Sequence, residues 1–233
     1  MSESTVLPQQ HAVSAASRRM LNERWQALNG QLQAEDVKLL AISKYAPDEA
    51  VQTLIDVGQR CFGESRPQAL RDRALRWPAC QWHMIGPLQK NKAKYVARHA
   101  AMWHSCCDLH TAAAVVAHLH GRSLPVLIQV NIAANPEQQG VTPAALPLFM
   151  ATLSKFEGLE VAGLMAMAPQ AGDVCGAFER MRHLRDEMFG GSVGLLSMGM
   201  SQDYRAAVAA GTDIVRLGSI LFAELDIRNN RNH

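Results

Sequence analysis

The sequence predicts a (β/α)₈ barrel, an α/β fold in which eight parallel strands close on themselves, with one extra helix in front. Short apolar runs without polar alternation recur along the chain, as expected for strands buried on both faces. A helical segment follows each run after a short connection, which is typical of a parallel sheet. Eight such units in about 200 residues fit a barrel near the small end of its size range.

The elements follow one another in a regular rhythm. The first is a helix expected over residues 11–29, where apolar side chains recur at three-to-four spacing before Gly30. Residues 37–43 then form the first strand, and the next helix begins at Pro47 and ends at Gly58. The other strands are expected at residues 60–63, 81–85, 101–105, 125–132, 159–167, 193–198 and 213–218. Their helices are expected at residues 66–76, 88–99, 108–120, 142–155, 174–189 and 202–210, with a short segment after the last strand.

An open doubly wound sheet is the alternative architecture. It normally has fewer strands and often a glycine-rich first turn, and no GxGxxG follows residues 37–43. No composition break or long linker divides the chain. We therefore expect a single domain over residues 1–233, with the barrel at about residues 37–224.

The composition excludes several classes of protein. Hydrophobic residues make up 48% and charged residues 19% of the 233 residues, and 23 Lys+Arg against 21 Asp+Glu give a formal charge of +2. These values are ordinary for a globular protein and give no reason to expect nucleic-acid binding. No apolar run is long enough to span a membrane, and the N-terminus lacks the pattern of a secretory signal. Five cysteines without a CxxC pair indicate free thiols in a reducing cytoplasm, and the nine histidines show no HExxH or other metal spacing.

A lysine stands where the first strand ends. In barrels of this kind the active site forms at the carboxyl ends of the strands. Lys44 follows the run LLAIS, so we expect it at the rim of the barrel mouth, directed at the central cavity. One interpretation is a solvated lysine at the start of a loop. The other is an amine made nucleophilic by partial desolvation and nearby cations, able to condense with an aldehyde.

Two serine- and glycine-containing segments follow the last two strands. Ser201 is a good N-cap for the helix expected at residues 202–210, and Gly218 and Ser219 open the last helical segment. The loops after the seventh and eighth strands of a barrel are its usual phosphate site. Ordinary helix caps are the alternative interpretation.

Arg216 lies inside the last predicted strand, where a buried guanidinium requires a partner. Two interpretations of Arg216 are open at this point. The guanidinium forms an ion pair with Glu64 or Asp213, or it contacts an acceptor atom of a ligand. An amine, an anion site and an arginine together describe a site for pyridoxal 5′-phosphate (PLP). With Arg216 against the ring nitrogen N1, that nitrogen would stay unprotonated and the ring would be a weaker electron sink.

At these residues the sequence resembles the pyridoxal-phosphate homeostasis protein family, single-domain relatives of the alanine racemase barrel. The blocks LLAISK, WHMIGPLQKNK, LSMGMSQDY and IVRLG carry the resemblance, which runs from about residue 20 to 224. It implies PLP held as an aldimine on Lys44, phosphate contacts from Ser201, Gly218 and Ser219, and Arg216 near N1. Further candidates for cofactor contacts are Met200, Ser197 and His83, with a core or indirectly acting histidine as the alternative for His83.

The chain departs from the family pattern at several places, one of which is the segment GLMAMAP, where the family has GLMxIP. Ser65 stands where the family commonly has asparagine, and Gln138 lies in a loop that often carries a lysine. A ring contact from Ser65 is therefore in doubt, and a second PLP-binding amine in that loop is absent.

The resemblance implies a PLP carrier in vitamin B6 and amino-acid homeostasis, without ordinary catalytic turnover. A low-activity amino-acid racemase is the alternative, disfavoured because the chain ends soon after the last strand, where racemases carry a second domain with a catalytic tyrosine. Tyr45 and Tyr204 are nearby, but neither has the setting of that tyrosine. A PLP-free barrel that binds another phosphate ester, with Lys44 as an aldolase-type amine, is the third possibility. We expect a cytoplasmic monomer with apo PLP enzymes as candidate recipients, and no nucleic-acid, membrane or metal partner.

Overall fold

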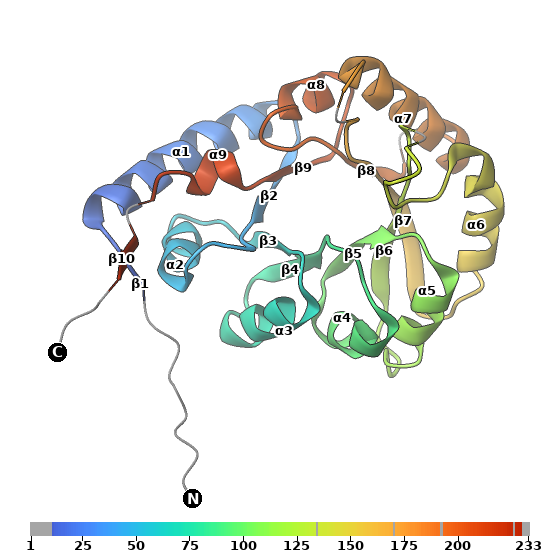
Figure 1. The fold of residues 1–233 in the computed structure, drawn as a ribbon, viewed down its shortest axis with the longest axis horizontal. Helices are drawn as coiled ribbons and strands as arrows, with labels where there is room; N and C mark the ends of the chain where they lie inside the picture. Colours follow the sequence, from blue (N-terminus) through green and yellow to red (C-terminus); the bar gives the residue numbers. More distant parts are fainter. Residues whose placement is uncertain (1–10, 134, 170, 192, 226, 230–233) are drawn as a thin grey trace, which may run out of the picture.

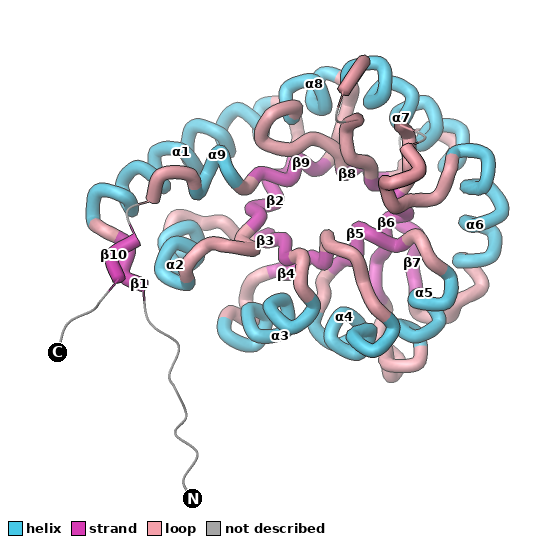
Figure 2. The backbone as a smooth tube through the Cα atoms, viewed as in Figure 1, coloured by secondary structure: helices cyan, strands magenta, loops and turns pink. Residues whose placement is uncertain are grey.

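The computed structural model describes residues 11–133, 135–169, 171–191, 193–225 and 227–229. Eight parallel strands, β2 to β9, close into a barrel in the order in which they occur along the chain (Figures 1 and 2). They are β2 (Lys38–Ile42), β3 (Cys61–Glu64), β4 (Gln81–Met84), β5 (Met102–Cys106), β6 (Leu124–Gln129), β7 (Leu159–Met165), β8 (Leu195–Ser197) and β9 (Ile214–Leu217). The predicted fold is confirmed, and the open-sheet alternative is excluded because β9 pairs with β2.

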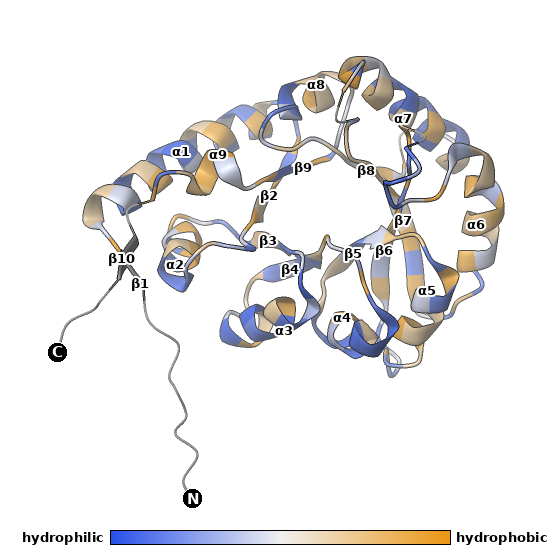
Figure 3. Ribbon diagram, viewed as in Figure 1, coloured by the Kyte–Doolittle hydropathy of each residue, from blue (hydrophilic) through white to orange (hydrophobic). Residues whose placement is uncertain are grey.

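Helices surround the barrel on its outer side, as Figure 2 shows. They are α1 (Ala15–Ala34), α2 (Asp48–Asp56), α3 (Pro67–Arg76), α4 (Ala93–His99), α5 (Leu109–Val116), α6 (Leu146–Leu153), α7 (Val174–Phe189), α8 (Tyr204–Ala209) and α9 (Ser219–Phe222). Figure 3 shows hydrophobic and hydrophilic residues alternating around these helices, as expected for helices with one face on a core. None of the helices in the described part of the chain is long and apolar enough to cross a bilayer.

Alternation along the strands separates two apolar clusters. The larger cluster joins the outward-facing strand residues to the helices and includes Phe62, Trp82 and Trp103, each at most 1% exposed. The smaller cluster is built on Leu40, Ile42 and Ile214 and lies on the opposite strand face, inside the barrel. The remaining inward positions are therefore available to polar side chains.

The N-terminal helix differs from its predicted range at both ends. His11–Val13 form strand β1, which pairs antiparallel with β10 (Ile227–Asn229). Periodicity cannot reveal this strand because its partner lies at the other end of the chain. Helix α1 then runs through Gly30 to Ala34, since a glycine inside a helix costs only about 1 kcal/mol and Leu32 beyond it is buried.

Two other helices begin later than predicted. Short 3₁₀ turns at Lys90–Lys92 and Pro143–Ala145 precede α4 and α6. Strand β6 also ends earlier, at Gln129. The side chain of Asn131 explains this end, because its Nδ2 donates to the carbonyl oxygens of Asn135 and Gln138 at 2.7 and 3.0 Å and holds a loop instead of a strand.

Candidate functional site

The barrel closure brings the exits of the first and last barrel strands together. β2 pairs with β9 in parallel, with Ala41 opposite Leu217. Lys44 follows β2, Gly218 follows β9, and both line one cavity of about 270 Å³ together with Ser219 and Tyr45. Three of the predicted site residues, Lys44, Gly218 and Ser219, thus share one cavity beside the exits of β2 and β9. The other predicted site residues do not line it; they are Ser197, Met200, Ser201, Arg216 and His83.

Lys44 is exposed at this mouth. Its Nζ lies 5.2 Å from the ring centroid of Tyr45, a side chain that is itself 83% exposed. The amine is therefore accessible to a molecule entering the cavity.

Gly218 follows β9 at a point where the chain passes close to Ile42 at the end of β2, and this close approach explains the glycine. A Cβ added at Gly218 would lie 3.3 Å from both the Cβ and the carbonyl oxygen of Ile42, tighter than ordinary van der Waals contact. At the start of α9 the amide of Leu221 donates to the carbonyl oxygen of Gly218 at 3.0 Å, whereas the amide of Ser219, the first residue of the helix, has no acceptor inside that helix.

Ser201 lies beside α9. Its Oγ accepts a hydrogen bond from the amide of Ile220 at 3.3 Å, so the loop after β8 contacts the start of the helix after β9. The predicted role of Ser201 as an N-cap is wrong, because α8 begins at Tyr204 and follows Asp203. The Asp203 carboxylate instead accepts from the amide of Met200 at 2.5 Å and shapes this loop.

Arg216 lies inside the barrel and is buried, with 5% of its surface exposed. Its Nη1 donates to the carbonyl and hydroxyl oxygens of Ser197 at 2.7 and 3.0 Å, and Nη2 donates to the carbonyl of Ala166 at 2.9 Å. The ion pair considered with Glu64 or Asp213 does not form among the described residues. Burial lowers the pKa of Arg216 to about 10, partly offset by the charge of Asp203, so the guanidinium stays charged at neutral pH.

A chain of hydrogen bonds continues from Arg216 through the barrel. The Oγ of Ser197 lies 3.0 Å from Nδ1 of His104, and Nε2 of His104 lies 2.9 Å from Nδ1 of His83. Burial lowers the pKa of both imidazoles, that of His83 to about 4. Both rings are therefore neutral at pH 7, and Ser197 and His83, two of the predicted site residues, belong to one buried network with Arg216.

Because of His83, acid should destabilise the fold between pH 6.5 and about 4. Its pKa is 6.5 in the unfolded chain and about 4 in the folded protein, because of burial and of the charge of Lys38. The unfolded chain then binds the proton first as the pH falls, so the free energy of unfolding decreases through this window, by about 3 kcal/mol. Glutamine keeps an acceptor and a donor but does not titrate, so we expect His83→Gln to lose about 3 kcal/mol less free energy of unfolding than the original protein between neutral and acid pH. Denaturant titrations at both pH values measure the difference. An equal loss in both proteins would contradict this role of His83.

A buried carboxylate lies one strand away from Lys44. Glu64 in β3 accepts a 2.7 Å hydrogen bond from the hydroxyl of Ser43 at its Oε1, and Arg73 Nε lies 3.5 Å from the same oxygen. Its Oε2 is buried without a partner in the described part of the chain. Burial raises the pKa of Glu64, against the hydrogen bond from Ser43 and the charge of Arg73, which lower it.

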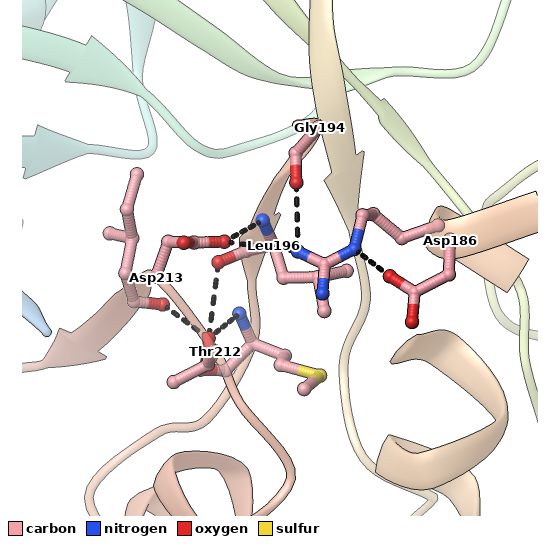
Figure 4. A network of polar contacts seen from close by, with 8 residues as sticks. Asp186, Gly194, Leu196, Thr212 and Asp213 are labelled. Carbon is pink, nitrogen blue, oxygen red and sulfur yellow. Dashed lines mark hydrogen bonds and ion pairs between the residues drawn. The ribbon is translucent and has the colours of Figure 1, made fainter. Parts of the chain in front are cut away.

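A second polar network holds β8 and β9 against α7 (Figure 4). Arg185 Nη1 donates to the carbonyl of Gly194 at 2.9 Å and lies 3.6 Å from Oδ2 of Asp213. The same carboxylate accepts from the amide of Leu196 at 2.6 Å. These contacts position the two strands whose exits carry Ser201 and Gly218.

Thr212 is central to this network, and Thr212→Val should destabilise the protein. Its buried hydroxyl accepts from the amide of Met198 at 3.2 Å and lies 3.1 to 3.2 Å from the carbonyls of Leu196, Met198 and Ile214, one of which can accept its hydrogen. Valine would remove this hydrogen bond, while the amide of Met198 keeps its other acceptor, the carbonyl oxygen of Ile214 at 3.1 Å, so the expected cost is about 0.5–1.5 kcal/mol. Urea denaturation measures the loss. Thr152→Val, which changes a hydroxyl at the surface of α6, should have a smaller effect, and equal effects would contradict the argument.

Other candidates are not part of the lining of the mouth cavity. Tyr204 is buried, and its hydroxyl accepts from Arg205 Nε at 3.3 Å. Ser65 is half-buried after β3, and Met200 is 41% exposed. All five cysteines are free thiols, and in the described ranges His, Cys, Asp and Glu form no group of three or more that could hold a metal ion.

The sequence analysis missed His104 and the Ser43–Glu64 pair. His104 and His83 occupy inward positions on the neighbouring strands β5 and β4, so alternation could have placed both rings inside the barrel. Their contact depends on how the two strands are offset, which has no local signal in the sequence.

Comparisons with known proteins agree with this architecture. Residues 17–226 match the family described as alanine racemase, N-terminal domain. The chain is 34% identical over 204 residues to the pyridoxal phosphate homeostasis protein of Escherichia coli (strain K12), covering 82% of this chain and 87% of that one. It is 39% identical over 198 residues to the protein of the same name from Deinococcus radiodurans, covering 82% and 90%.

Solved structures give the same result. PipY of Synechococcus elongatus PCC7942, solved with PLP bound, is 32% identical and superposes with a TM-score of 0.79 over 87% of this chain and 99% of that one. An alanine racemase of Clostridium difficile shares the fold with a TM-score of 0.71 at 15% identity, over 97% of this chain and 61% of the racemase. The chain belongs to the alanine racemase N-terminal domain family and, within it, to the pyridoxal phosphate homeostasis proteins.

Proposed function

We propose that this protein is a single PLP-binding domain that binds PLP at the barrel mouth. It acts in vitamin B6 and amino-acid homeostasis without ordinary catalytic turnover. The observation that carries the proposal is that Lys44, Gly218 and Ser219 line a single cavity. The homeostasis proteins it resembles and the PLP-bound PipY support it.

The residues at the mouth fit the chemistry of PLP. The cavity of about 270 Å³ is close to the lower end, about 300 Å³, of small-molecule sites. It combines a primary amine with the close backbone approach at Gly218, where a Cβ would fill space beside Ile42. Bound there, PLP supplies an aldehyde that condenses with an amine and a ring that withdraws electrons.

Each predicted residue has a role in this proposal. Lys44 would hold PLP by condensation of its Nζ with the aldehyde, which releases water, and Ser201, Gly218 and Ser219 would hold the phosphate through hydroxyls and backbone amides. Met200 borders the phosphate loop. Arg216 remains charged and presents a cation toward N1, which disfavours protonation of that nitrogen.

Ser197 and His83 act on the cofactor through Arg216. Ser197 holds Nη1 of Arg216 directly, and His83 supports Ser197 through His104. These contacts hold the guanidinium in one orientation.

The position of the tyrosines argues against two-base racemisation. Tyr45 follows Lys44 directly in the chain, with its ring centroid 5.2 Å from Lys44 Nζ, and Tyr204 is buried. Racemisation needs an acid or base on each face of the substrate Cα. We therefore propose a carrier that passes PLP to apo PLP enzymes, as a cytoplasmic monomer.

Reductive labelling tests the proposal. The purified protein is loaded with PLP, desalted, reduced with borohydride and mapped by peptide mass spectrometry, and we expect a pyridoxyl group on Lys44. Pyridoxal, which lacks the phosphate, should be retained less well. A label on another lysine, or no label, contradicts the site. Incubation with L-alanine in deuterated water should give no Cα exchange, and clear exchange would favour the racemase.

A further inference from the structure

A second cavity lies at the opposite end of the barrel from Lys44. Its volume is about 250 Å³. Its lining includes the first residues of six barrel strands, which places it at the amino ends of the strands, and we call it the floor cavity. These residues are Lys38, Cys61, Gln81, Met102, Leu195 and Ile214.

The polar groups of the floor cavity are donors. Lys38 supplies an ammonium group, and its charge acts on both Cys61 and His83. The thiol of Cys61 lies 3.4 Å from Oε1 of Gln81 and donates to it, which leaves the amide NH₂ of Gln81 for another acceptor. None of the described residues that line the cavity is acidic.

The contacts of Arg216 favour one tautomer of His83. A guanidinium only donates, so Ser197 Oγ accepts from Arg216. The hydrogen of the Ser197 hydroxyl then needs an acceptor, and we assign it to Nδ1 of His104 at 3.0 Å, the acceptor that the described contacts of this hydroxyl offer. The neutral His104 then carries its hydrogen on Nε2 and donates it to Nδ1 of His83.

The neutral His83 consequently carries its hydrogen on Nε2. This side chain is 7% exposed and lines the floor cavity. The chain of hydrogen bonds from Arg216 thus ends at the floor cavity with the Nε2–H donor of His83, and Lys38 lines the same cavity.

The remaining lining is apolar and includes Leu40, Leu195 and Pro125. We propose that the floor cavity binds a small monocarboxylate with a short aliphatic body, whose carboxylate accepts hydrogen bonds from Lys38, Gln81 and His83. A zwitterionic amino acid fits less well, because its ammonium group would lie near Lys38. The site does not depend on PLP binding at the other end of the barrel.

Calorimetric titration with two isosteric probes tests this site on the full chain without added PLP. We expect 3-methylbutanoate to bind and 3-methylbutanamide, which lacks the charge, to bind at least about tenfold more weakly, since charge-assisted hydrogen bonds contribute about 1.5–3 kcal/mol. Lys38→Met should raise the Kd for 3-methylbutanoate by about tenfold. Lys90→Met, at an exposed lysine elsewhere, is the matched control and should leave binding unchanged.

Nitrogen-15 NMR of the histidines provides a second readout. His83 should show the Nε2–H tautomer, and the signal of that hydrogen should shift when 3-methylbutanoate is added but not when the amide is added. His83→Gln should reduce binding while circular dichroism shows an intact fold. Equal binding of acid and amide, no binding of either, or unchanged binding in Lys38→Met would overturn the proposal. Loss of PLP labelling at Lys44 would leave these results untouched, so the two sites are tested separately.

Discussion

Lys44→Ala is expected to abolish reductive labelling of the protein by PLP. Lys44 is the lysine that lines the mouth cavity, which has a volume of about 270 Å³ and is also lined by Gly218 and Ser219. Removing the amine removes the covalent attachment and leaves only the phosphate and ring contacts. We expect the apparent Kd for PLP to rise by about a hundredfold or more, which corresponds to about 2.8 kcal/mol. Absorption spectra during titration with PLP, and peptide mapping after borohydride, measure the two effects.

The substitution should leave the fold intact. Lys44 is exposed, and the contact found for its Nζ is with the exposed ring of Tyr45, so its removal should change the free energy of unfolding by about 0.5 kcal/mol or less. Lys90→Ala is the matched control at an exposed lysine outside the cavity and should label as the original protein does. Undiminished labelling of the Lys44→Ala protein would show that another amine holds the cofactor.

Gly199→Ala is expected to lower the free energy of unfolding by about 2–4 kcal/mol, since strain and overpacking each cost about 1–3 kcal/mol. Gly199 has φ +91°, a backbone conformation that favours glycine. An added Cβ would lie 2.6 Å from the Cβ of Ala207 and 3.0 Å from the Cα of Tyr204. Because Gly199 opens the loop that carries Ser201, the substitution should also weaken PLP binding. Urea denaturation and PLP titration measure the two losses.

A second substitution separates the two causes. Ala207→Gly removes the methyl group that the new Cβ would meet at 2.6 Å but leaves the backbone conformation of residue 199 unchanged. In that background Gly199→Ala should cost less, by about 1 kcal/mol or more, which a double-mutant cycle measures. An unchanged cost would assign the whole effect to the backbone, and no cost in either background would contradict the argument.

The order of the elements could be predicted because it depends on neighbouring residues. Runs such as residues 37–43 are apolar throughout, and a strand buried on both faces needs that composition. The position of Lys44 followed from the rule that barrel sites form at strand exits. The error at residues 11–13 has the same origin, because β1 is defined by pairing with β10 and not by a local pattern.

The interior of the barrel could not be predicted in this way. For Arg216 the sequence left an ion pair with Glu64 or Asp213 and a ligand contact as alternatives, and the structure shows a guanidinium held by carbonyl oxygens and by Ser197. The two carboxylates are used elsewhere, by Arg73 and Ser43 near β3 and by Arg185 at α7. Which partner a buried charge finds depends on the stagger of strands around the closed barrel.

By itself, the sequence determined the strand and helix order, the barrel class and the amine and glycine at the two strand exits, because short-range patterning and chain order control them. Only the tertiary structure decided that Lys44 and Gly218 share a cavity. It also decided that His104 meets Ser197, 93 residues away, and that His83 faces the opposite end of the barrel. These contacts join strands that are distant in sequence, so their geometry is set by barrel closure and register, which no local segment encodes.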